Sequence, residues 1–457
     1  MKITKYWNKS FEKNPHKKTV FMPRKKRGRI LKQARYNLFN IPSRMVTVDL
    51  LTDSGTGELS HQQMELQNRA DEAYAYAASY EKLERAAKEF SGFSHVLPVH
   101  QGRGAESLIA HFLKETGRVR ENDILLSNGF FDTTRANFEH AGARCINIPT
   151  PKSLDIESNT PFKGDIDLQK LEEYLGSEKG KQAKAILLTL TNNTGGGQPV
   201  SFQNVLRTKI LAEQYNKLLI IDACRIVENA YFVQREEMPG FSYKDVVRLL
   251  FGYADIAYMS AKKDGLANGG GFIVTDHDDL FEELSNITMG FLLRTYGFRH
   301  YAGMTGATME TVARGLKEVV KPSYLRKRVA DTAYLHAKLK KIGVPVLCPP
   351  GGHAVYVDAA AMLPHISKEQ FPGKALEVAL YFEGGIRSCE IGSVMFGDAA
   401  QYEWVRLAIP RRKYKRIAFD YIACVFERLL RKKDSMRGFS TEEAPGLRHF
   451  YADFKPL

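Results

Sequence analysis

Lys217-Leu218-Leu219-Ile220-Ile221-Asp222 is a short apolar run that ends on an acidic residue. Similar runs alternate along the middle of the chain with stretches of helical periodicity. This alternation is typical of a mostly parallel sheet that is flanked by helices. The sequence therefore predicts an α/β fold around this run.

The predicted elements extend from this run in both directions. Strands are expected at Asp123–Ser127, Arg144–Ile148, Ala183–Thr191, Lys217–Asp222, Asp255–Ser260 and Gly271–Thr275. Helical periodicity fits Gly104–Thr116, Phe131–Gly142, Gln203–Tyr215 and Tyr243–Phe251. From about Met309 the pattern changes to long amphipathic helices at Thr311–Val320 and Tyr324–Ile342. β-rich stretches follow at Val344–Leu347, His353–Val357, Gly385–Ser388 and Val405–Ala408.

The chain length predicts two domains. With 457 residues the chain exceeds the size at which a single hydrophobic core stops growing. We expect a large α/β domain over residues 48–315 and a smaller α+β domain over residues 316–457. Residues 20–47 are expected to join the smaller domain, and residues 1–19 to form a basic N-terminal arm.

The composition indicates an intracellular globular protein. Hydrophobic residues make up 44% of the chain and charged residues 26%, which is far from the disordered and membrane classes. No apolar run approaches the roughly 20 residues that span a bilayer, and the N-terminal sequence has no secretory apolar segment. The five cysteines form no CxxC pair, which excludes a zinc module on spacing and suits a reducing cytoplasm.

The net charge of +14 is concentrated at the N-terminus. Between residues 1 and 35 Lys and Arg far outnumber the single acid Glu12, and they include the cluster Arg24-Lys25-Lys26-Arg27-Gly28-Arg29. Such a cluster can contact nucleic acid, an acidic membrane surface or an acidic partner, or it can be a solvated arm that packs on a neighbouring subunit. No zinc-finger, RNA-binding or zipper signature accompanies it, which disfavours nucleic acid.

Residues that follow the predicted strands are the first candidates for a site, because ligands of open α/β sheets bind beyond the carboxyl ends of the strands. Asp222 ends one strand and could keep a pyridine nitrogen protonated, although a turn or helix-capping aspartate is an equal alternative. Lys263 follows the strand that ends at Ser260, and it could form a Schiff base with an aldehyde. Lys262 is a rival for this role, and Ser260 and Lys262 could hold a phosphate. Taken alone, two lysines after a strand are usually surface residues.

A glycine-rich turn, Gln101-Gly102-Arg103-Gly104-Ala105-Glu106, opens the helix that runs to Thr116. Backbone N–H groups at a helix start, together with the helix dipole, favour phosphate. The turn does not match the dinucleotide or Walker patterns, so nucleotide binding is disfavoured. A phosphate-binding turn, an acid for a ring nitrogen and a Schiff-base lysine occur here in this chain order. Together they are stronger evidence for a cofactor site than any one of them alone.

Nearly the whole chain, from about Met22 onward, resembles the β-eliminating lyases, the family of tryptophanase and tyrosine phenol-lyase. The strings that carry this resemblance are Asp49-Leu50-Leu51-Thr52-Asp53-Ser54-Gly55-Thr56, Asp71-Glu72-Ala73-Tyr74, His100-Gln101-Gly102-Arg103-Gly104-Ala105-Glu106, Gly196-Gly197-Gln198-Pro199-Val200-Ser201, Glu228-Asn229-Ala230-Tyr231-Phe232 and Met259-Ser260-Ala261-Lys262-Lys263-Asp264. The resemblance implies the aspartate aminotransferase type of pyridoxal-phosphate fold, fold type I. It also implies a carbon–carbon lyase that releases an aromatic ring, pyruvate and ammonia, and a homotetramer whose active sites are shared between subunits.

The resemblance also assigns roles to individual residues. It implies Lys263 as the Schiff-base lysine, Asp222 as the partner of the ring nitrogen and Tyr74 as the acid that protonates the leaving ring. The residues that it matches to other cofactor contacts are Gln101, Gly102, Arg103 and Ser260 at the phosphate, Phe131 stacked on the ring, and Asn193 and Arg225 beside its hydroxyl oxygen. Arg406 matches the clamp on the substrate carboxylate, near Thr52 and Ser54. Gly55, Glu72 and Asn268 match the ligands of a potassium ion.

Three positions favour L-tryptophan, and thus indole release, over L-tyrosine. Asp132, Ile391 and His449 match the tryptophanase residues, where tyrosine phenol-lyase has threonine, arginine and phenylalanine. We expect Asp132 and His449 to form a polar network near indole.

The chain departs from both relatives at Tyr76-Ala77-Ala78, at Tyr296-Gly297-Phe298-Arg299 and in the shortened connection Met395–Tyr402. A tyrosine, a substituted tryptophan or an S-linked cysteine therefore stays an alternative substrate. The alternative functions are an aminotransferase of the same fold and a nucleic-acid-binding protein on an inactive scaffold.

Overall fold

The computed structural model describes residues 10–14, 17–442 and 447–457. The chain forms two compact units. The terminal unit comprises Met1–Glu58, Ile156–Asn159 and Val329–Leu457, and the central unit comprises Leu59–Asp155 and Thr160–Arg328. The divisions thus follow Glu58 and Arg328, whereas the sequence placed them after residues 47 and 315. The expected N-terminal arm, residues 1–19, lies in large part outside the described residues.

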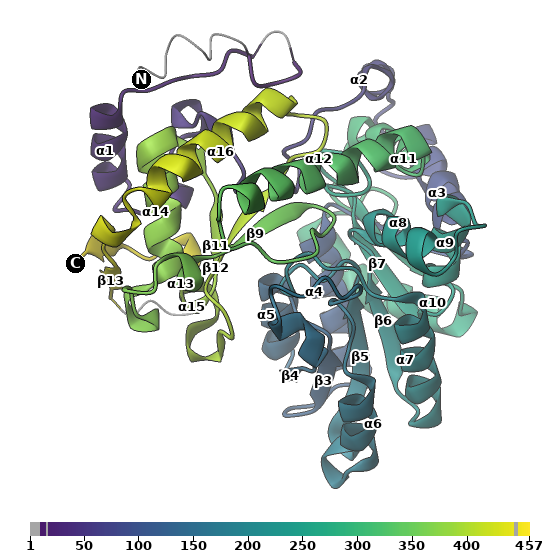
Figure 1. Ribbon diagram of the computed structural model, residues 1–457. Coiled ribbons are helices and arrows are strands. Elements are labelled where there is room, and N and C mark those ends of the chain that lie inside the picture. The colour runs from purple at the N-terminus through teal and green to yellow at the C-terminus, as the bar shows by residue number, and fades with distance from the viewer. Residues whose placement is uncertain (1–9, 15–16, 443–446) are drawn as a thin grey trace. The chain divides into compact units, whose positions relative to one another are not determined.

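The central unit is built on a seven-stranded sheet with the strand order β2-β8-β7-β6-β5-β3-β4. Its strands are β2 (His95–Val99), β3 (Ile124–Ser127), β4 (Arg144–Asn147), β5 (Ala183–Thr189), β6 (Leu218–Asp222), β7 (Ile256–Ser260) and β8 (Gly271–Thr275). β8 is antiparallel to its neighbours β2 and β7, and the other pairs are parallel. Figure 1 shows the parallel strands side by side between helices. The predicted mostly parallel sheet is confirmed. The sequence had not indicated β2, an edge strand that contains Pro98.

Helices cover both faces of this sheet, which explains the unbroken apolar strands. On one face, α4 (Gly102–Glu115), α5 (Asp132–His140) and α10 (Asp278–Thr295) share a core with strand residues such as Leu187 and Ile220. Their neighbours Leu188 and Ile221, which point to the other face, are also fully buried. Helix α7 (Phe202–Gln214) packs against β5 and β6.

The central unit contains further helices, and several of them start at a capping side chain. These further helices are α2 (His61–Gln67), α3 (Ala78–Ser91), α6 (Leu168–Gly176), α8 (Ile226–Glu236), α9 (Tyr243–Phe251) and α11 (Gly306–Val319). The hydroxyls of Ser201, Ser242 and Thr305 accept hydrogen bonds from the first turns of α7, α9 and α11, as N-cap residues do. The chain then leaves the central unit within helix α12 (Pro322–Lys341).

The terminal unit is an α+β structure with short strands. β9 (Ala354–Asp358), β12 (Trp404–Ala408) and β11 (Cys389–Ile391) form an antiparallel sheet, while β1 (Val48–Asp49) pairs in parallel with β10 (Ile386–Arg387) and β13 (Phe439–Thr441) pairs with β14 (Phe454–Pro456). The β-rich stretch expected at Val344–Leu347 forms no named strand and makes only an isolated bridge between Val346 and Val357. Pro345 removes a backbone donor there, which limits a ladder.

The N-terminal segment belongs to the terminal unit through helix α1 (Arg24–Gln33), which holds the basic cluster. Arg27 is buried, and its guanidinium donates to the carbonyl oxygens of Phe382 and Glu383 at the end of helix α14 (Pro372–Gly384), at 2.8 and 2.6 Å. A cation at a helix C-terminus satisfies carbonyls that have no partner within the helix. At least this member of the cluster therefore serves packing and is withdrawn from any surface partner.

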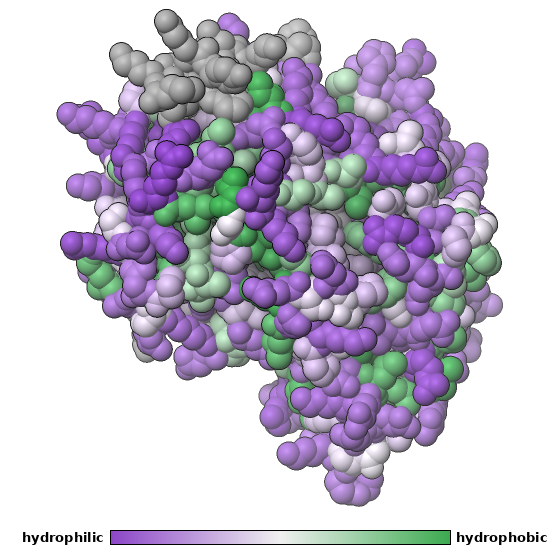
Figure 2. All heavy atoms as spheres, in the orientation of Figure 1, coloured by the Kyte–Doolittle hydropathy of each residue, from purple (hydrophilic) through white to green (hydrophobic). Residues whose placement is uncertain are grey.

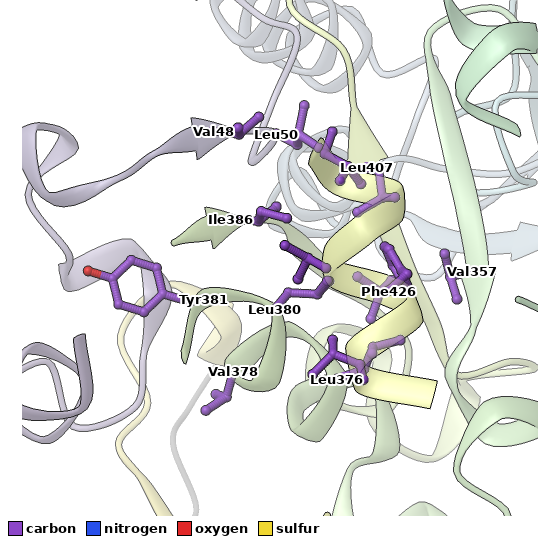
Figure 3. Packing of buried hydrophobic residues seen from close by; sticks show 14 of the residues in the cluster. Val48, Leu50, Val357, Leu376, Val378, Leu380, Tyr381, Ile386, Leu407 and Phe426 are labelled. Atoms are coloured by element: carbon purple, nitrogen blue, oxygen red, sulfur yellow. The ribbon is translucent and has the colours of Figure 1, made fainter. Parts of the chain in front are cut away.

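A contiguous apolar core holds the terminal unit together (Figure 3). Leu376 and Leu380 of α14 lie beside Phe426 of α16 (Arg416–Leu430), and Leu407 and Val357 come from the antiparallel sheet. All five side chains are fully buried. The short helices α13 (Ala359–Met362) and α15 (Ser393–Phe396) complete this unit.

The visible surface is mainly hydrophilic, with hydrophobic side chains exposed in small groups (Figure 2). In the part of the chain that the structure describes, no helix combines the length and the apolar composition that crossing a membrane requires.

We predict that Phe426→Ala destabilises the terminal unit by about 3–5 kcal/mol, because it leaves a cavity in this core. Glu427→Ala, on the same helix at an exposed position, should change stability by less than about 0.5 kcal/mol. Guanidinium unfolding of the two variants measures the difference. Equal stability of both variants would contradict the packing of α16.

Candidate active site

Asp222 lies at the carboxyl end of β6, between two neighbouring strands. It is in register with Thr189 on β5 and Tyr258 on β7. Its side chain is only 5% exposed, and Oδ1 accepts a hydrogen bond from the backbone N–H of Cys224 at 3.0 Å. A buried carboxylate requires donors or a cation to offset its lost hydration, and a protonated ring nitrogen is such a partner.

Lys263 lies in the tight turn that follows β7. Its backbone N–H donates to the carbonyl of Ser260 at 3.2 Å, and its own carbonyl accepts from the N–H of Leu266 at 3.0 Å. Asp264 anchors this turn, since its Oδ2 accepts from the backbone N–H of Val227 in helix α8 at 2.8 Å. The turn that carries Lys263 is thus tied to the segment that follows Asp222.

Three basic side chains gather at the same edge of the sheet: Arg103, Lys262 and Lys263. Burial lowers the pKa of Lys262, and the positive charges of Arg103 and Lys263 lower it further. Burial also lowers the pKa of His100, with smaller contributions from Arg103 and Lys262. Cations that repel one another in this way are stabilised by a bound anion, such as phosphate.

The start of helix α4 packs unusually close to the ends of two strands. A Cβ on Gly102 would lie 2.6 Å from Ser260 Cβ, and a Cβ on Gly104 would lie 2.6 Å from Cε1 of His100. Gln101 is the N-cap residue of this helix, and its side chain makes no capping hydrogen bond within the part of the chain that the structure describes. Its first backbone N–H groups and its dipole therefore favour an anion at this position.

The other predicted cofactor-binding residues also lie in the central unit. Phe131 is half-buried and precedes helix α5. Asn193 follows β5 and Arg225 precedes α8, with side chains that are buried. The backbone N–H of Arg225 donates to the carbonyl of Leu190 at 3.0 Å, which ties the loop after β6 to the loop after β5. The structure thus brings the predicted cofactor-binding residues to one edge of one sheet.

The residues that were matched to the substrate carboxylate lie in the terminal unit. Arg406 is in β12, and its Nη2 donates to the carbonyl of Leu51 at 3.1 Å. Thr52 follows directly, and its Oγ1 accepts from the backbone N–H of Ser54 at 3.1 Å. Arg406 therefore lies next to the segment that carries Thr52 and Ser54.

The three residues predicted to select the ring are divided between the units. Ile391 is fully buried in the terminal unit, opposite Trp404 in the sheet. His449, in the same unit, is buried with its ring 4.0 Å from that of Phe450. Asp132 is buried in the central unit, where its Oδ1 accepts from the backbone N–H of Thr133 at 2.6 Å. The expected network between Asp132 and His449 stays a prediction.

Tyr74 is 61% exposed, and it contacts the segment that follows helix α10. Its Oη accepts a hydrogen bond from the backbone N–H of Phe298 at 3.2 Å. The rings of Phe298 and Tyr301 lie 6.2 and 5.8 Å from the Tyr74 ring. A Cβ on Gly297 would lie 3.4 Å from Cε2 of this ring. A residue that matches the family, Tyr74, is therefore in contact with a segment that departs from the family pattern, Tyr296-Gly297-Phe298-Arg299.

The potassium site stays a prediction. Gly55 belongs to the terminal unit, whereas Glu72 and Asn268 are exposed residues of the central unit. Within residues 10–14, 17–442 and 447–457, no three His, Cys, Asp or Glu side chains form a group that could hold a metal ion. The predicted ligands are of a different kind, since only one of the three has a carboxylate.

Comparison with known sequences decides the family, because the profile of the β-eliminating lyases matches residues 49–425. The chain belongs to the β-eliminating lyase family. Its lyase relatives include the tryptophanase of Salinibacter ruber, which is 45% identical over 95% of this chain and 92% of the relative. The tryptophanase of Hyphomonas neptunium is 43% identical (95% and 96% covered), and the tyrosine phenol-lyase of Pasteurella multocida is 38% identical (95% of each covered).

A solved structure shares the fold of this lyase. A serine palmitoyltransferase from S. paucimobilis, with pyridoxal phosphate and myriocin bound, is 14% identical and has a TM-score of 0.56 over 85% of this chain and 88% of that chain. The predicted family and the pyridoxal-phosphate fold type are thus confirmed.

The residues of the central unit fit pyridoxal phosphate. The start of α4 and the three cations suit its phosphate, while the buried carboxyl of Asp222 suits its ring nitrogen. Lys263 offers a primary amine to its aldehyde. Gly102 leaves room for this cradle only because it has no side chain.

Sequence reasoning missed a buried polar group beside Asp222. Glu106 of α4 is 5% exposed, although Ile109, Ala110 and Leu113 on the same helix face are buried apolar residues. An acid within the apolar stripe of a helix was the signal that could have revealed it, because such an acid needs a specific polar environment.

We predict that Gly102→Ala lowers the affinity for pyridoxal phosphate by at least about tenfold, or ~1.4 kcal/mol, because the new methyl meets Ser260. Titration of the visible absorbance of the bound cofactor measures the affinity. Ser107→Ala, on the same helix, is the matched control and should bind normally.

A Ser260→Gly background tests whether the effect of Gly102→Ala is steric, with Ser260→Gly alone as the reference for the loss of the hydroxyl. In a Ser260→Gly background, Gly102→Ala should cost much less than in the wild type, since the opposing Cβ is gone. An equal cost in both backgrounds would contradict the close approach of α4 to β7.

Proposed function

We propose that this lyase removes the side chain of an aromatic amino acid by β-elimination, with L-tryptophan as substrate and indole, pyruvate and ammonia as products. The observation that carries this proposal is the arrangement of Asp222, Lys263 and the turn at Gly102 at one sheet edge. The two relatives at 45% and 43% identity, both named tryptophanase, support the choice of substrate.

The residues of the central unit would bind and orient the cofactor. Bound pyridoxal phosphate supplies an electron sink for the charge that develops at the substrate α-carbon. Asp222 would keep the ring nitrogen protonated, and Phe131 would stack on the ring. The residues that would hold its phosphate and hydroxyl oxygen are Gln101, Gly102, Arg103, Ser260 and Lys262, and Asn193 and Arg225.

Two residues would move protons. Lys263 Nζ would take the proton from the substrate α-carbon, as a positioned amine does in general base catalysis. Tyr74 Oη would give a proton to the ring carbon that bears the side chain. The backbone N–H of Phe298, which donates to Tyr74 Oη at 3.2 Å, would stabilise the phenolate that remains.

The terminal unit would supply the substrate contacts. Arg406 would clamp the carboxylate with its planar fork, beside Thr52 and Ser54. Ile391 offers only apolar surface, which suits an indole ring better than a phenol hydroxyl. The remodelled segments around Tyr76 and Phe298 keep tyrosine, a modified tryptophan or an S-linked cysteine as alternative substrates.

We further propose a homotetramer in the cytoplasm with potassium bound by Gly55, Glu72 and Asn268. Their oxygen atoms are donors of the type that a hard cation prefers. Tyr74 is 61% exposed. A tyrosine that donates a proton to a bound ring must be shielded from water during the reaction, so this exposure supports active sites that are shared between subunits.

We predict that Lys263→Ala abolishes the visible absorbance of the bound cofactor and lowers kcat/KM for pyruvate release by about 10²–10⁴-fold or more. Lys262→Ala is the control: it would weaken only the contact with the phosphate, so at saturating pyridoxal phosphate it should keep the absorbance. Borohydride treatment of the wild type should attach a pyridoxyl group at Lys263, which peptide mass spectrometry locates. A label at Lys262 instead would reverse the assignment, and a colourless wild type would refute the proposed function.

The choice of ring has its own test. We predict that pyruvate release is faster with L-tryptophan than with L-tyrosine, measured within a panel of β-substituted amino acids. His449→Phe should shift the kcat/KM ratio toward L-tyrosine, because it removes a polar partner that suits indole. A ratio unchanged by this substitution would show that His449 does not select the ring.

A further inference from the structure

A buried carboxyl, Glu106, lies one turn into helix α4. Its Oε1 accepts a hydrogen bond from the hydroxyl of Thr134 in helix α5 at 2.9 Å. Its Oε2 is buried and makes no hydrogen bond to any residue that the structure describes. A carboxylate with one oxygen unpaired in a buried site pays a large desolvation cost, whereas the protonated form pays much less.

Glu106 is electrostatically coupled to Asp222. Burial, followed by the negative charge of Asp222, raises the pKa of Glu106 to about 7. The nearby side chain of Thr133, the hydrogen bond from Thr134 and the positive charge of Lys263 oppose this rise. Two buried carboxyl groups that interact in this way avoid double ionisation, and one of them keeps a proton.

The surroundings decide which carboxyl keeps the proton. Asp222 accepts a backbone N–H from Cys224 at 3.0 Å, which stabilises its charged form. The other titratable groups that face this pair stay neutral: burial and the charge of Asp222 raise the pKa of both Cys224 and Tyr258. Lys263 is the cation that faces the pair. The proton therefore resides on Glu106.

We propose that Glu106 is a positioning residue that carries a proton beside Asp222, and that the arrival of a ring-nitrogen cation at Asp222 releases this proton to solvent. The inference rests on the proposed function, because it takes Asp222 as the partner of the ring nitrogen. The physical reason is that the charge of the ring nitrogen and the ionisation of Glu106 favour each other. A positive ring nitrogen offsets the charge of Asp222, and ionised Glu106 in turn stabilises the ring-nitrogen proton.

Infrared spectroscopy of the full-length chain tests the first half of this proposal. Below about pH 7 Glu106 is protonated, so the wild type should show the carbonyl stretch of a buried carboxylic acid that disappears as the pH rises from about 6 to about 8, on either side of the pKa of about 7. Glu106→Gln should lack this step. Glu115→Gln, at an exposed position of the same helix, is the control and should keep it.

The second half is tested by adding the cofactor. Pyridoxal phosphate should move the infrared step of the wild type to lower pH by about one unit, the size of a typical effect of a neighbouring charge. An analogue with carbon in place of the ring nitrogen binds without that positive charge and should leave the step where it is. Equal shifts with both compounds would overturn the proposal.

A second variant, Thr134→Val, tests the proton on Glu106 independently of whether Glu106→Gln folds. Thr134→Val removes the hydroxyl that donates to Glu106 and should move the step to higher pH, because that hydrogen bond lowers the pKa of Glu106. A wild type without the step, or a step that Thr134→Val does not move, would refute a proton on Glu106. Failure of Lys263 to bind the cofactor would refute the proposed function instead, and the infrared step of the unloaded chain would still report on Glu106.

Discussion

The negative charge of Asp222 is buried at the end of β6, and keeping a carboxylate there costs free energy that several neighbours offset. The parallel arrangement of β5, β6 and β7 brings Asp222 to a sheet edge where a backbone N–H from Cys224 reaches it. As proposed, Glu106 would lower this cost by keeping its proton, until a cationic ring nitrogen offsets the charge of Asp222 in its place. The proposed position of the cofactor's ring follows from this charge, and the start of α4 at Gly102 would hold its phosphate.

Much of this architecture could be predicted from the sequence because it depends on local patterns. The buried strands of the central unit are unbroken apolar runs, and Asp222 and Lys263 follow them directly. β2 was not predicted from the sequence because Pro98 interrupts its strand pattern. An edge strand tolerates such a proline. Pro345 had the reverse effect, because it limits a segment of strand-like composition to one bridge.

The parts of the site that escaped prediction depend on contacts between distant segments. Tyr76 and His300 are far apart in sequence, yet their rings lie 3.8 Å apart, and Tyr74 rests on Phe298 nearby. Burial lowers the pKa of His300, so this histidine packs as a neutral ring. Read singly, the two departures from the family pattern look like independent changes. In the folded chain they form one aromatic surface, so a change in one segment requires an accommodating change in the other.

The residues proposed to bind the cofactor lie in the central unit, whereas Arg406, Ile391 and His449, which are proposed to contact the substrate, lie in the terminal unit. Asp132, the third residue proposed to select the ring, lies in the central unit. This division of labour has an evolutionary consequence. If the proposed roles hold, mutations in the terminal unit would change the preferred leaving group while the residues proposed to bind the cofactor are inherited unchanged. Such an arrangement would let closely related sequences diverge toward different amino acids without changing the cofactor site.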